Sequence, residues 1–436
     1  MLTLYSFVVL VLFLCLLPFA LLVSFVKPNI FRELMERLGF YPKAFTEYLQ
    51  ALKRQKKAII WVNAASVGEI TMVQPLIKEL DARLPNSGYL VVVNSRSGEQ
   101  MANKLFGAEK VILQPLDLPG VTRMVARKIR PQLTIAAEFE MWPNIIRELS
   151  KVGSKMVLLN GAMDNKILQY YRFFPGLLTS TLNRLELLGM KNEAEKKMVQ
   201  ALGVMPKKVR VTGDLKYDGG LKNLPEAERK ALSGSLQLPD DAFVFVAGST
   251  HPGEEEIIFQ VYRELKAEFP KLVLIIAPRH IERSGEVKQS AVRFNLKTIE
   301  RTRITEKAPS EGTNGYEVLI LDTIGELADL YSVSTLAFVG GSLVKKGGHN
   351  LLEPVLFGKP VLFGPYIQDF QRIAETLLRN NIGIMVQDRE DLKQKTRLLL
   401  RDEARRRAIS AQAQELLEKE KGALTRSLNM IEELMK

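Results

Sequence analysis

Short, unbroken apolar runs recur along the chain and alternate with stretches of helical periodicity. Typical runs are AIIWVN, YLVVVN, LTIAA, MVLLN, FVFVAG and LVLIIA. Strands buried on both faces carry such continuous runs, because helices cover both sides of a parallel sheet. Strands that alternate with helices indicate βαβ units. The sequence therefore predicts an α/β fold built from doubly wound, Rossmann-like sheets.

The alternation is interrupted over residues 214–241, where glycine, proline and charged residues are concentrated. A chain of 436 residues also exceeds the usual size of a single core. We therefore predict a first domain over residues 27–215, a linker over 216–240, and a second domain with C-terminal helices over 241–436. Two such domains that face each other would bind ligands in the cleft outside the carboxyl ends of their strands.

The first 26 residues carry no charged side chain and include the apolar run FVVLVLFLCLLPFALLVSFV. This length matches the roughly 20 apolar residues that a membrane-spanning helix needs. Residues 27–57 contain eight Lys or Arg against three acids, which places them on the cytoplasmic side. We predict a single-pass anchor over residues 1–26, with the catalytic domains in the cytoplasm. A buried helix or a cleaved signal peptide are the alternatives.

The net charge of +12 favours anionic partners, namely membrane lipids, acidic substrates or nucleic acid. Basic residues are not interleaved with aromatic ones, so no nucleic-acid partner is expected. Cys15 is the one cysteine, and His251, His280 and His349 are not at metal-ligand spacing on one element, so no metal is expected. Dinucleotide-binding, P-loop and D-x-D motifs are absent from the sequence, which disfavours dehydrogenases, P-loop ATPases and metal-dependent sugar transfer.

Charged motifs in the first half follow predicted strands or precede the linker. In ASVGE, Ser66 and Glu69 have the spacing of a capping box, and Glu69 could alternatively take a proton from a hydroxyl nucleophile. Glu138 and Glu140 follow the run LTIAA, either in a solvated loop or at an acceptor site. Lys216 is either a solvated linker residue or a group that stabilises negative charge on a leaving phosphate.

Motifs in the second half combine glycines with polar residues after predicted strands. Arg279 ends the run LVLIIAPR, where its guanidinium could bind a phosphate or form a surface salt bridge. Asn350 and Glu353 could cap a helix, or Glu353 could bind the sugar hydroxyls of a nucleotide. The candidate phosphate-binding residues, which could equally form ordinary helix caps, are Gly248, Ser249, Gly347 and Gly348.

These motifs, in this order, resemble the Kdo (3-deoxy-D-manno-octulosonic acid) transferases of lipopolysaccharide assembly. The runs SVGE, PRH, GELADLY and GGHNLLEP carry the resemblance, which covers nearly the whole chain. It implies a GT-B fold, CMP-Kdo as donor, a tetraacylated lipid A precursor (lipid IVA) as acceptor, and inversion at the anomeric carbon. It also implies neither metal nor cofactor, and a place at the cytoplasmic face of the bacterial inner membrane, in contact with its lipids.

The same resemblance assigns roles to individual residues. It implies that Glu69 is the general base, and that Glu138 and Lys216 stabilise the transition state. The implied CMP-binding residues are Pro278, Arg279, Ile324, Gly325, Glu326, Asn350, Leu351, Leu352 and Glu353. Two positions depart from the family pattern in the acceptor half: Asn63 replaces a histidine, and the 94–97 loop, NSRS, replaces a threonine-rich one.

A single displacement fits one general base and no nucleophile on the enzyme. Two other functions remain open from the sequence. One is a membrane-anchored GT-B transferase that uses a UDP-sugar, and the other is a membrane-tethered protein that binds a nucleotide without catalysis. Competition between CMP and UDP for binding would separate the two donors.

Overall fold

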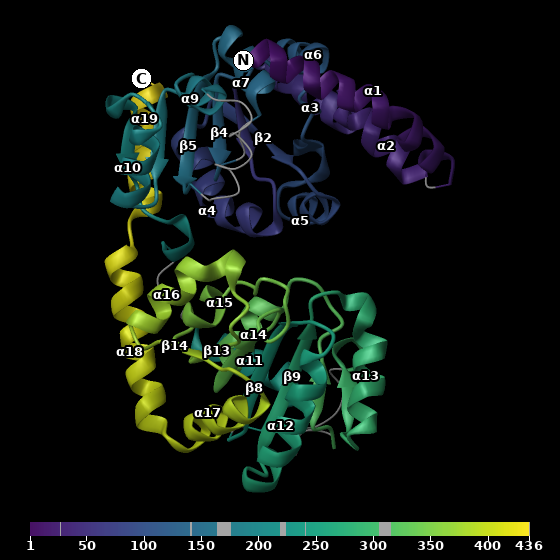
Figure 1. Ribbon diagram of the computed structural model, residues 1–436, viewed down its shortest axis with the longest axis vertical. Coiled ribbons are helices and arrows are strands. Elements are labelled where there is room, and N and C mark those ends of the chain that lie inside the picture. Colours follow the sequence, from purple (N-terminus) through teal and green to yellow (C-terminus); the bar gives the residue numbers. More distant parts are fainter. Residues whose placement is uncertain are drawn as a thin grey trace. The chain divides into compact units, whose positions relative to one another are not determined.

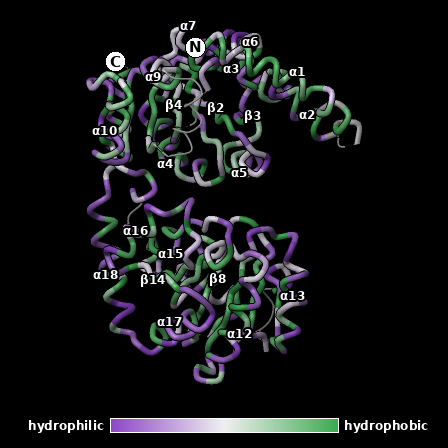
Figure 2. Tube along the Cα trace, viewed as in Figure 1, coloured by the Kyte–Doolittle hydropathy of each residue, from purple (hydrophilic) through white to green (hydrophobic). Residues whose placement is uncertain are grey.

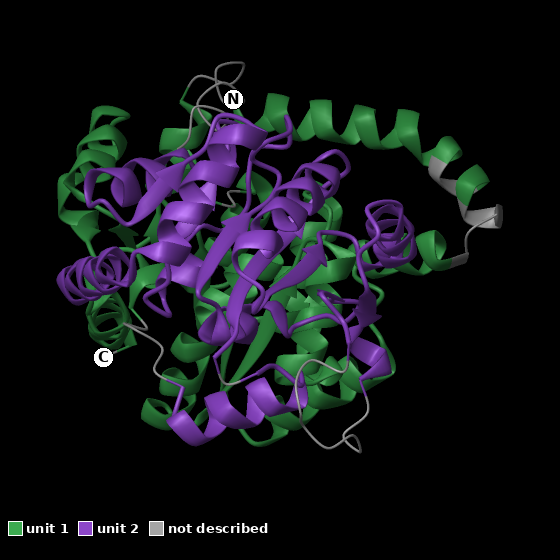
Figure 3. Cartoon of the chain, turned by 90° about the horizontal axis from the view of Figure 1, so that it is seen from below, with its two compact units in different colours: residues 1–218, 420–436 green, residues 219–419 purple. Residues whose placement is uncertain are grey.

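A computed structural model describes residues 1–26, 28–139, 142–163, 176–218, 224–239, 241–304 and 315–435 (Figure 1). The chain divides into two compact units, coloured separately in Figure 3. Unit 1 comprises Met1–Asp218 together with Glu420–Lys436, and unit 2 comprises Gly219–Lys419. Each unit is built around its own seven-stranded sheet.

The sheet of unit 1 has the order β3-β2-β1-β4-β5-β6-β7, and each neighbouring pair is parallel. The order reverses direction between β1 and β4, so this pair forms the topological switch point. The strands are β1 (Ala58–Asn63), β2 (Ser87–Val93), β3 (Val111–Leu113), β4 (Leu133–Ala137), β5 (Lys155–Gly161), β6 (Leu187–Met190) and β7 (Val209–Val211).

Helices cover both faces of this sheet, and successive side chains of β1 point alternately into the two resulting apolar clusters. Ile59 and Trp61 enter one apolar cluster, whereas Ile60 and Val62 enter another on the opposite face. The first cluster includes α3 (Lys43–Arg54), α6 (Pro119–Ile129), α7 (Pro143–Lys151), α9 (Leu177–Leu182) and α10 (Glu193–Ala201); the second includes α4 (Val67–Arg83), α5 (Arg96–Phe106) and α19 (Ala423–Met435).

Unit 2 repeats the architecture with the order β10-β11-β9-β8-β12-β13-β14, again with parallel neighbours and a switch point between β8 and β12. Its strands are β8 (Phe243–Thr250), β9 (Leu272–Pro278), β10 (Thr298–Glu300), β11 (Val318–Ile320), β12 (Leu336–Val339), β13 (Val361–Phe363) and β14 (Gly383–Met385). Its helices are α11 (Glu226–Ser235), α12 (Glu254–Glu268), α13 (Ser284–Arg293), α14 (Leu327–Val333), α15 (Leu352–Val355), α16 (Gln371–Arg379), α17 (Arg389–Arg401) and α18 (Glu403–Glu420). The predicted pair of doubly wound α/β sheets is confirmed.

The apolar N-terminal run forms one helix, α1 (Leu2–Val26), which is hydrophobic along its length in Figure 2. Its window Leu2–Phe19 has a mean hydropathy of 2.5 and is only 11% buried, so α1 is long and apolar enough to cross a membrane. Its first turn nevertheless packs on unit 1. The Tyr5 hydroxyl donates to Asp117 Oδ2 over 3.0 Å, and the Ser6 hydroxyl donates to Asn144 Oδ1 over 2.7 Å.

The following helix, α2 (Pro28–Arg37), is also tied to unit 1, near the ends of β2 and β3. Arg37 donates to the carbonyl oxygen of Asn94 over 2.7 Å, and Glu36 Oε1 accepts from the Leu113 amide over 2.9 Å. The chain is therefore attached to unit 1 both at the first turn of α1 and at the end of α2.

The C-terminal helices depart from the predicted domain boundaries. The sequence predicts that all of 241–436 belongs to the second domain, but α19 belongs to unit 1. Leu428 and Ile431, spaced three residues apart on one face of α19, lie in the same apolar cluster as the buried side of α4. Arg426 adds a hydrogen bond from Nε to the carbonyl oxygen of Thr212 over 2.8 Å. In the predicted linker, residues 219–223 and 240 lie outside the described part of the chain.

Replacement of Ile431 by alanine tests this placement. Ile431 is fully buried in unit 1, so Ile431→Ala should destabilise that unit by about 2–5 kcal/mol. Amide hydrogen exchange should then accelerate in β4 and β5 but not in β8 and β9. Glu433→Ala, at a half-exposed position of the same helix, should change stability by less than about 0.5 kcal/mol. Equal acceleration in both units would contradict the assignment.

Candidate functional site

The candidate general base Glu69 lies in the first turn of α4, directly after β1 at the switch point of unit 1. Ser66 caps the helix and accepts from the Glu69 amide over 3.3 Å. The carboxylate in turn accepts from the Ala65 amide over 2.8 Å and from the Ser66 hydroxyl over 2.9 Å. The capping geometry that the sequence allowed is therefore present. Both carboxylate oxygens of the candidate base are thus engaged at the start of the helix.

Glu138 follows β4, the other strand of the switch point, with its backbone in the left-handed region at φ 64°. Its Oε1 accepts from three groups: Lys216 Nζ at 3.0 Å, Lys191 Nζ at 3.2 Å and the buried side-chain amide of Asn160 at 3.0 Å. The structure thus brings together Glu138 and Lys216, which are far apart in the sequence. Glu140, the second acid of that motif, lies outside the described residues.

This cluster fixes the charge of Glu138. Burial would raise the pKa of the carboxyl group, but the ammonium groups of Lys191 and Lys216 outweigh it and lower the pKa to about 2. Glu138 is therefore ionised at neutral pH and has no proton to donate. Its position suits electrostatic stabilisation, because it holds two ammonium groups at the carboxyl edge of the sheet.

Lys191 is a member of this cluster that the sequence analysis missed. Burial would lower its pKa, but the carboxylates of Asp214 and Glu138 raise it, so the side chain is charged. Asp214 Oδ2 lies 3.4 Å from Lys191 Nζ, and Asp214 Oδ1 accepts from the Lys216 amide over 3.0 Å. The available signal was its place directly after the apolar run LLGM, which forms β6. We refer to Glu138, Asn160, Lys191, Asp214 and Lys216 as the lysine cluster.

In unit 2, the loop after β12 approaches the end of β8 very closely. A Cβ atom at Gly340 would lie 2.5 Å from the carbonyl oxygen of Ser249, so only glycine fits this position. The amides that follow are already occupied by a carboxylate. Glu254, at the start of α12 and fully buried, accepts from the amides of Gly341 at 2.7 Å, Leu343 at 2.9 Å, and Ser342 and His251 at 3.0 Å. This acid anchors the glycine-rich loop, a role that the sequence analysis did not assign to it.

The predicted phosphate-binding glycines lie at this carboxyl edge. Gly248 is buried at the end of β8, where a Cβ atom would lie 2.1 Å from the Tyr331 hydroxyl oxygen. Ser249 has a left-handed backbone at φ 56°. Gly347 and Gly348 also have positive φ, and the Gly348 amide donates to the carbonyl oxygen of Gly341 over 2.9 Å. Part of the backbone that could cradle a phosphate is therefore used to hold the loop itself.

All three histidines of the chain gather here, although they are far apart in the sequence. His251 Nε2 and His349 Nε2 are 2.8 Å apart with stacked rings, and the His280 ring centroid lies 6.2 Å from that of His251. One hydrogen between two ring nitrogens makes one a donor and the other an acceptor. Burial is the main cause that lowers the pKa of His349 to about 4, and the neighbouring His251 and Arg279 contribute to the same shift. Among the described residues, no group of three or more His, Cys, Asp or Glu side chains could hold a metal ion.

The residues expected to contact CMP lie after β12 and after two further strands of unit 2, β9 and β11. Pro278 is buried as the last residue of β9, and Arg279 beside it is exposed. Ile324 is 65% exposed after β11. Gly325 is also exposed, and Glu326, the N-cap residue of α14, accepts from Arg301 Nε over 2.9 Å.

The segment 350–353 forms the start of α15. Asn350 Oδ1 accepts from the Leu352 amide, and Asn350 Nδ2 donates to Glu353 Oε1, each over 3.2 Å. The side chains of Leu351 and Leu352 are buried in the core, so a nucleotide could meet these two residues only through their backbone. Glu353 is half-buried. Burial is the main cause that raises the pKa of the Tyr331 hydroxyl, and the nearby Glu353 carboxylate raises it further.

Comparison with known proteins gives consistent results. The sequence model of the family described as "3-Deoxy-D-manno-octulosonic-acid transferase (kdotransferase)" matches residues 32–219. A 3-deoxy-D-manno-octulosonic acid transferase of Haemophilus influenzae is 32% identical over 412 residues, which cover 94% of this chain and 93% of that protein.

A bifunctional glycosyltransferase/methyltransferase of Fusobacterium nucleatum is 33% identical over 81% of this chain. The match covers 54% of that longer relative, so this chain spans about half of its length. Among solved structures, a UDP-N-acetylglucosamine 2-epimerase superposes with a TM-score of 0.58 and 15% identity, over 87% of this chain and 95% of the other. At that identity the likeness concerns the fold alone, which is of the GT-B type.

Replacement of Glu254 tests its role as the anchor of the glycine-rich loop. Glu254→Ala removes the acceptor of four buried amides, which should cost about 3–5 kcal/mol. Amide hydrogen exchange at Gly341, Ser342 and Leu343 should accelerate strongly, as followed by mass spectrometry. Glu256→Ala, at an exposed position on the same helix, is the matched control and should cost less than about 1 kcal/mol. Similar exchange rates in the two variants would refute the anchoring role.

Proposed function

The chain belongs to the 3-deoxy-D-manno-octulosonic acid (Kdo) transferase family, and on that premise we propose that it transfers Kdo from CMP-Kdo to a lipid A precursor, lipid IVA, at the cytoplasmic face of the inner membrane. The observations that support this most strongly are Glu69 and the lysine cluster. Glu69 follows β1 and Glu138 of the cluster follows β4, the two strands of the switch point of unit 1, where doubly wound sheets bind ligands. We therefore assign the binding of the acceptor to unit 1.

We assign Glu69 as the general base of a single inverting displacement. The carboxylate takes the proton of a sugar hydroxyl while that oxygen bonds to the anomeric carbon of Kdo. The bond from that carbon to the phosphate oxygen breaks, and CMP leaves with the bonding electron pair. Hydrogen bonds from the Ala65 amide and the Ser66 hydroxyl orient the carboxylate before the proton arrives.

The lysine cluster supplies positive charge without a proton transfer. Lys216 is the group that we assign to stabilise the negative charge developing on the leaving phosphate, as the family resemblance implies. Glu138 keeps Lys216 in place over 3.0 Å, and Lys191 balances the second carboxylate of the cluster, Asp214. Because the lysines are fixed by these ion pairs before substrate binds, little reorganisation accompanies the reaction.

For the donor, we assign the carboxyl edge of the sheet in unit 2. The exposed Arg279 offers a guanidinium fork to a phosphate, and His280 lies next to it. Pro278 ends β9 beside Arg279, and the other proposed CMP contacts follow β11 and β12; parallel strands present them at the same edge. These others are Ile324, Gly325, Glu326, Asn350, Leu351, Leu352 and Glu353, with Gly248, Ser249, Gly347 and Gly348 as candidate phosphate contacts.

We further propose that α1 associates the enzyme with the membrane. Its apolar surface and the net charge of +12 suit an anionic lipid surface and an anionic acceptor. The contacts of Tyr5 and Ser6 hold the first turn of α1 on the same unit as the end of α2. A single-pass crossing by α1 would therefore have to break these contacts, whereas a helix lying in the membrane surface would keep them.

The base assignment predicts the behaviour of Glu69→Gln. The amide retains an oxygen that can accept from the Ala65 amide, so the helix cap should persist, but it cannot accept the hydroxyl proton. Transfer of Kdo should fall by about a hundredfold or more, with CMP-Kdo binding unchanged. Transfer is measured by product mass and donor binding by calorimetry.

The control is Glu79→Gln, at a half-exposed position of the same helix, which should keep the activity of the unchanged enzyme. Near-normal transfer by Glu69→Gln would overturn the assignment of the base.

A further inference from the structure

Asn160 is a fully buried polar residue near the end of β5, next to the lysines of the lysine cluster. Its backbone is left-handed at φ 56°. Leu158 and Gly161 of β5 pair with Leu188 and Met190 of β6, so β5 carries one extra residue here, a β-bulge. Bulges re-aim side chains and are frequent beside active sites.

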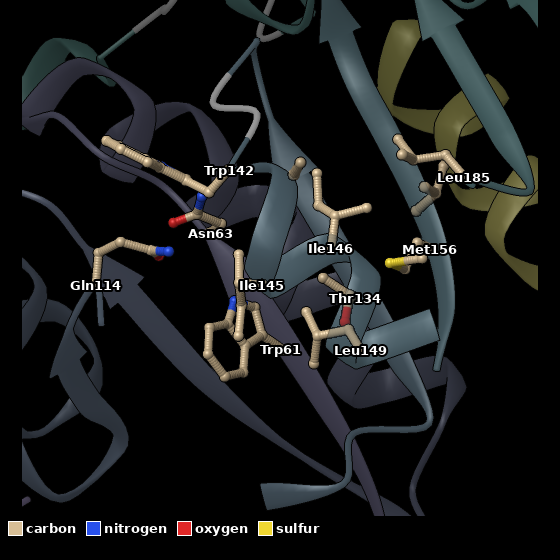
Figure 4. A pocket seen from close by; sticks show the side chains of 12 residues that line it. Trp61, Asn63, Gln114, Thr134, Trp142, Ile145, Ile146, Leu149, Met156 and Leu185 are labelled. Carbon is tan, nitrogen blue, oxygen red and sulfur yellow. The ribbon is translucent and has the colours of Figure 1, made fainter. Parts of the chain in front are cut away.

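The bulge turns Asn160 toward the face of the sheet that α4 covers. Earlier in β5 the side chains alternate: Met156 lines a small space with Ile146 of α7 (Figure 4), whereas Val157 lies in the apolar cluster on the α4 side. Strict alternation would direct Asn160, like Met156, toward α7. Its side-chain nitrogen instead lies 3.0 Å from Met72 Sδ of α4.

The side-chain amide of Asn160 connects three segments of unit 1. Its Nδ2 donates to Glu138 Oε1, after β4, and to Met72 Sδ, on α4, each over 3.0 Å. Its Oδ1 accepts from the Leu215 amide over 2.9 Å. Both hydrogens of the amide nitrogen and a lone pair of its oxygen are thus used to join these segments.

The connected segments carry the residues that we assign to the chemistry. Met72 follows Glu69 by three residues, so the two buried side chains share one face of α4. Leu215 directly precedes Lys216 in a short 3-10 helix. Asn160 therefore lies between the helix of the proposed base and the turn of the proposed leaving-group lysine.

A neutral side chain suits this place, because the charges of the lysine cluster already balance. Glu138 and Asp214 contribute two carboxylates, and Lys191 and Lys216 contribute two ammonium groups. A third carboxylate in place of Asn160 would lie next to that of Glu138. Two carboxylates so close together favour the retention of one proton between them.

We propose that Asn160 is a positioning residue, which fixes Lys216 and Glu138 relative to α4, the helix that carries Glu69. It acts through the main chain of Leu215 and the carboxylate of Glu138. A misplacement of a catalytic group by about 1 Å lowers a rate by up to about a hundredfold, even where binding is unaffected. The kinetic consequence rests on the proposed function, but the contact with Leu215 can be tested without turnover.

A double-mutant cycle separates positioning from general destabilisation. Asn160→Ala should lower kcat by about tenfold or more, with less than about a twofold change in KM for CMP-Kdo. In a Lys216→Ala background the same substitution should lower kcat by less than about twofold, because the positioned ammonium group is absent. An equal fold loss in both backgrounds would overturn the proposal. Asn183→Ala is the matched control and should keep kcat, since Asn183 likewise bridges two backbone groups of unit 1, the Gly203 carbonyl and the Met205 amide, each over 3.1 Å.

Asn160→Asp keeps the proposal testable if the alanine variant does not fold. The new side chain retains an acceptor for the Leu215 amide but replaces the donor to Glu138 by a carboxylate oxygen. Their proximity raises the pKa of the carboxylate pair, so a proton persists there to higher pH and weakens the hold on Lys216. The acid limb of the kcat profile should therefore move to higher pH, whereas Asn183→Asp should keep the profile of the unaltered protein. Coinciding profiles of the two variants would overturn the proposal.

Amide hydrogen exchange separates this inference from the proposed function. Asn160→Ala removes the acceptor of the Leu215 amide, so exchange at Leu215 should accelerate by about tenfold, as followed by mass spectrometry. Asn183→Ala should leave exchange at Leu215 unchanged. Failure of the unaltered protein to transfer Kdo would refute the proposed function, whereas unchanged exchange at Leu215 in Asn160→Ala would overturn the positioning role.

Discussion

Parallel pairing is the constraint on which both halves of the candidate site depend. In a parallel sheet every strand presents its carboxyl end at the same edge, so residues distant in sequence meet there. In unit 1 this brings Lys191 and Lys216 to Glu138, and in unit 2 it brings His349 to His251. The charged groups are thus assembled by the topology, and the helices on both faces mainly supply the buried apolar area that holds the strands.

Two buried carboxylates illustrate how their surroundings determine their roles. Glu138 faces two ammonium groups, which lower its pKa to about 2 and keep it ionised. Glu254 accepts from four backbone amides in the described part of the chain, and burial raises its pKa despite these hydrogen bonds. The first arrangement presents charged lysines at the sheet edge, whereas the second fastens a glycine-rich loop. The same residue type thus contributes electrostatics in one unit and loop geometry in the other.

The sequence predicted the two doubly wound sheets because buried parallel strands leave long apolar runs, such as those of β1 and β9. It also placed Glu138 and Arg279 directly after such runs, and Glu69 at the start of the helix that follows the first run. Lys191 also follows such a run, but its partners Glu138 and Asp214 are distant in sequence, so its role was not predicted. The same holds for Glu254, since three of the four amides that it binds lie in the loop after β12. The place of α19 in unit 1 was not predicted for a related reason. An apolar stripe predicts that one face of a helix is buried, but it does not indicate which of two cores the helix packs against.

The most direct measurement is the mass of the product formed by the purified full-length protein with CMP-Kdo and lipid IVA. We predict that the acceptor gains the mass of one or more Kdo units and that CMP is released in equal number. A protein that left the acceptor unchanged with CMP-Kdo but glycosylated a lipid from a UDP-sugar would contradict the account.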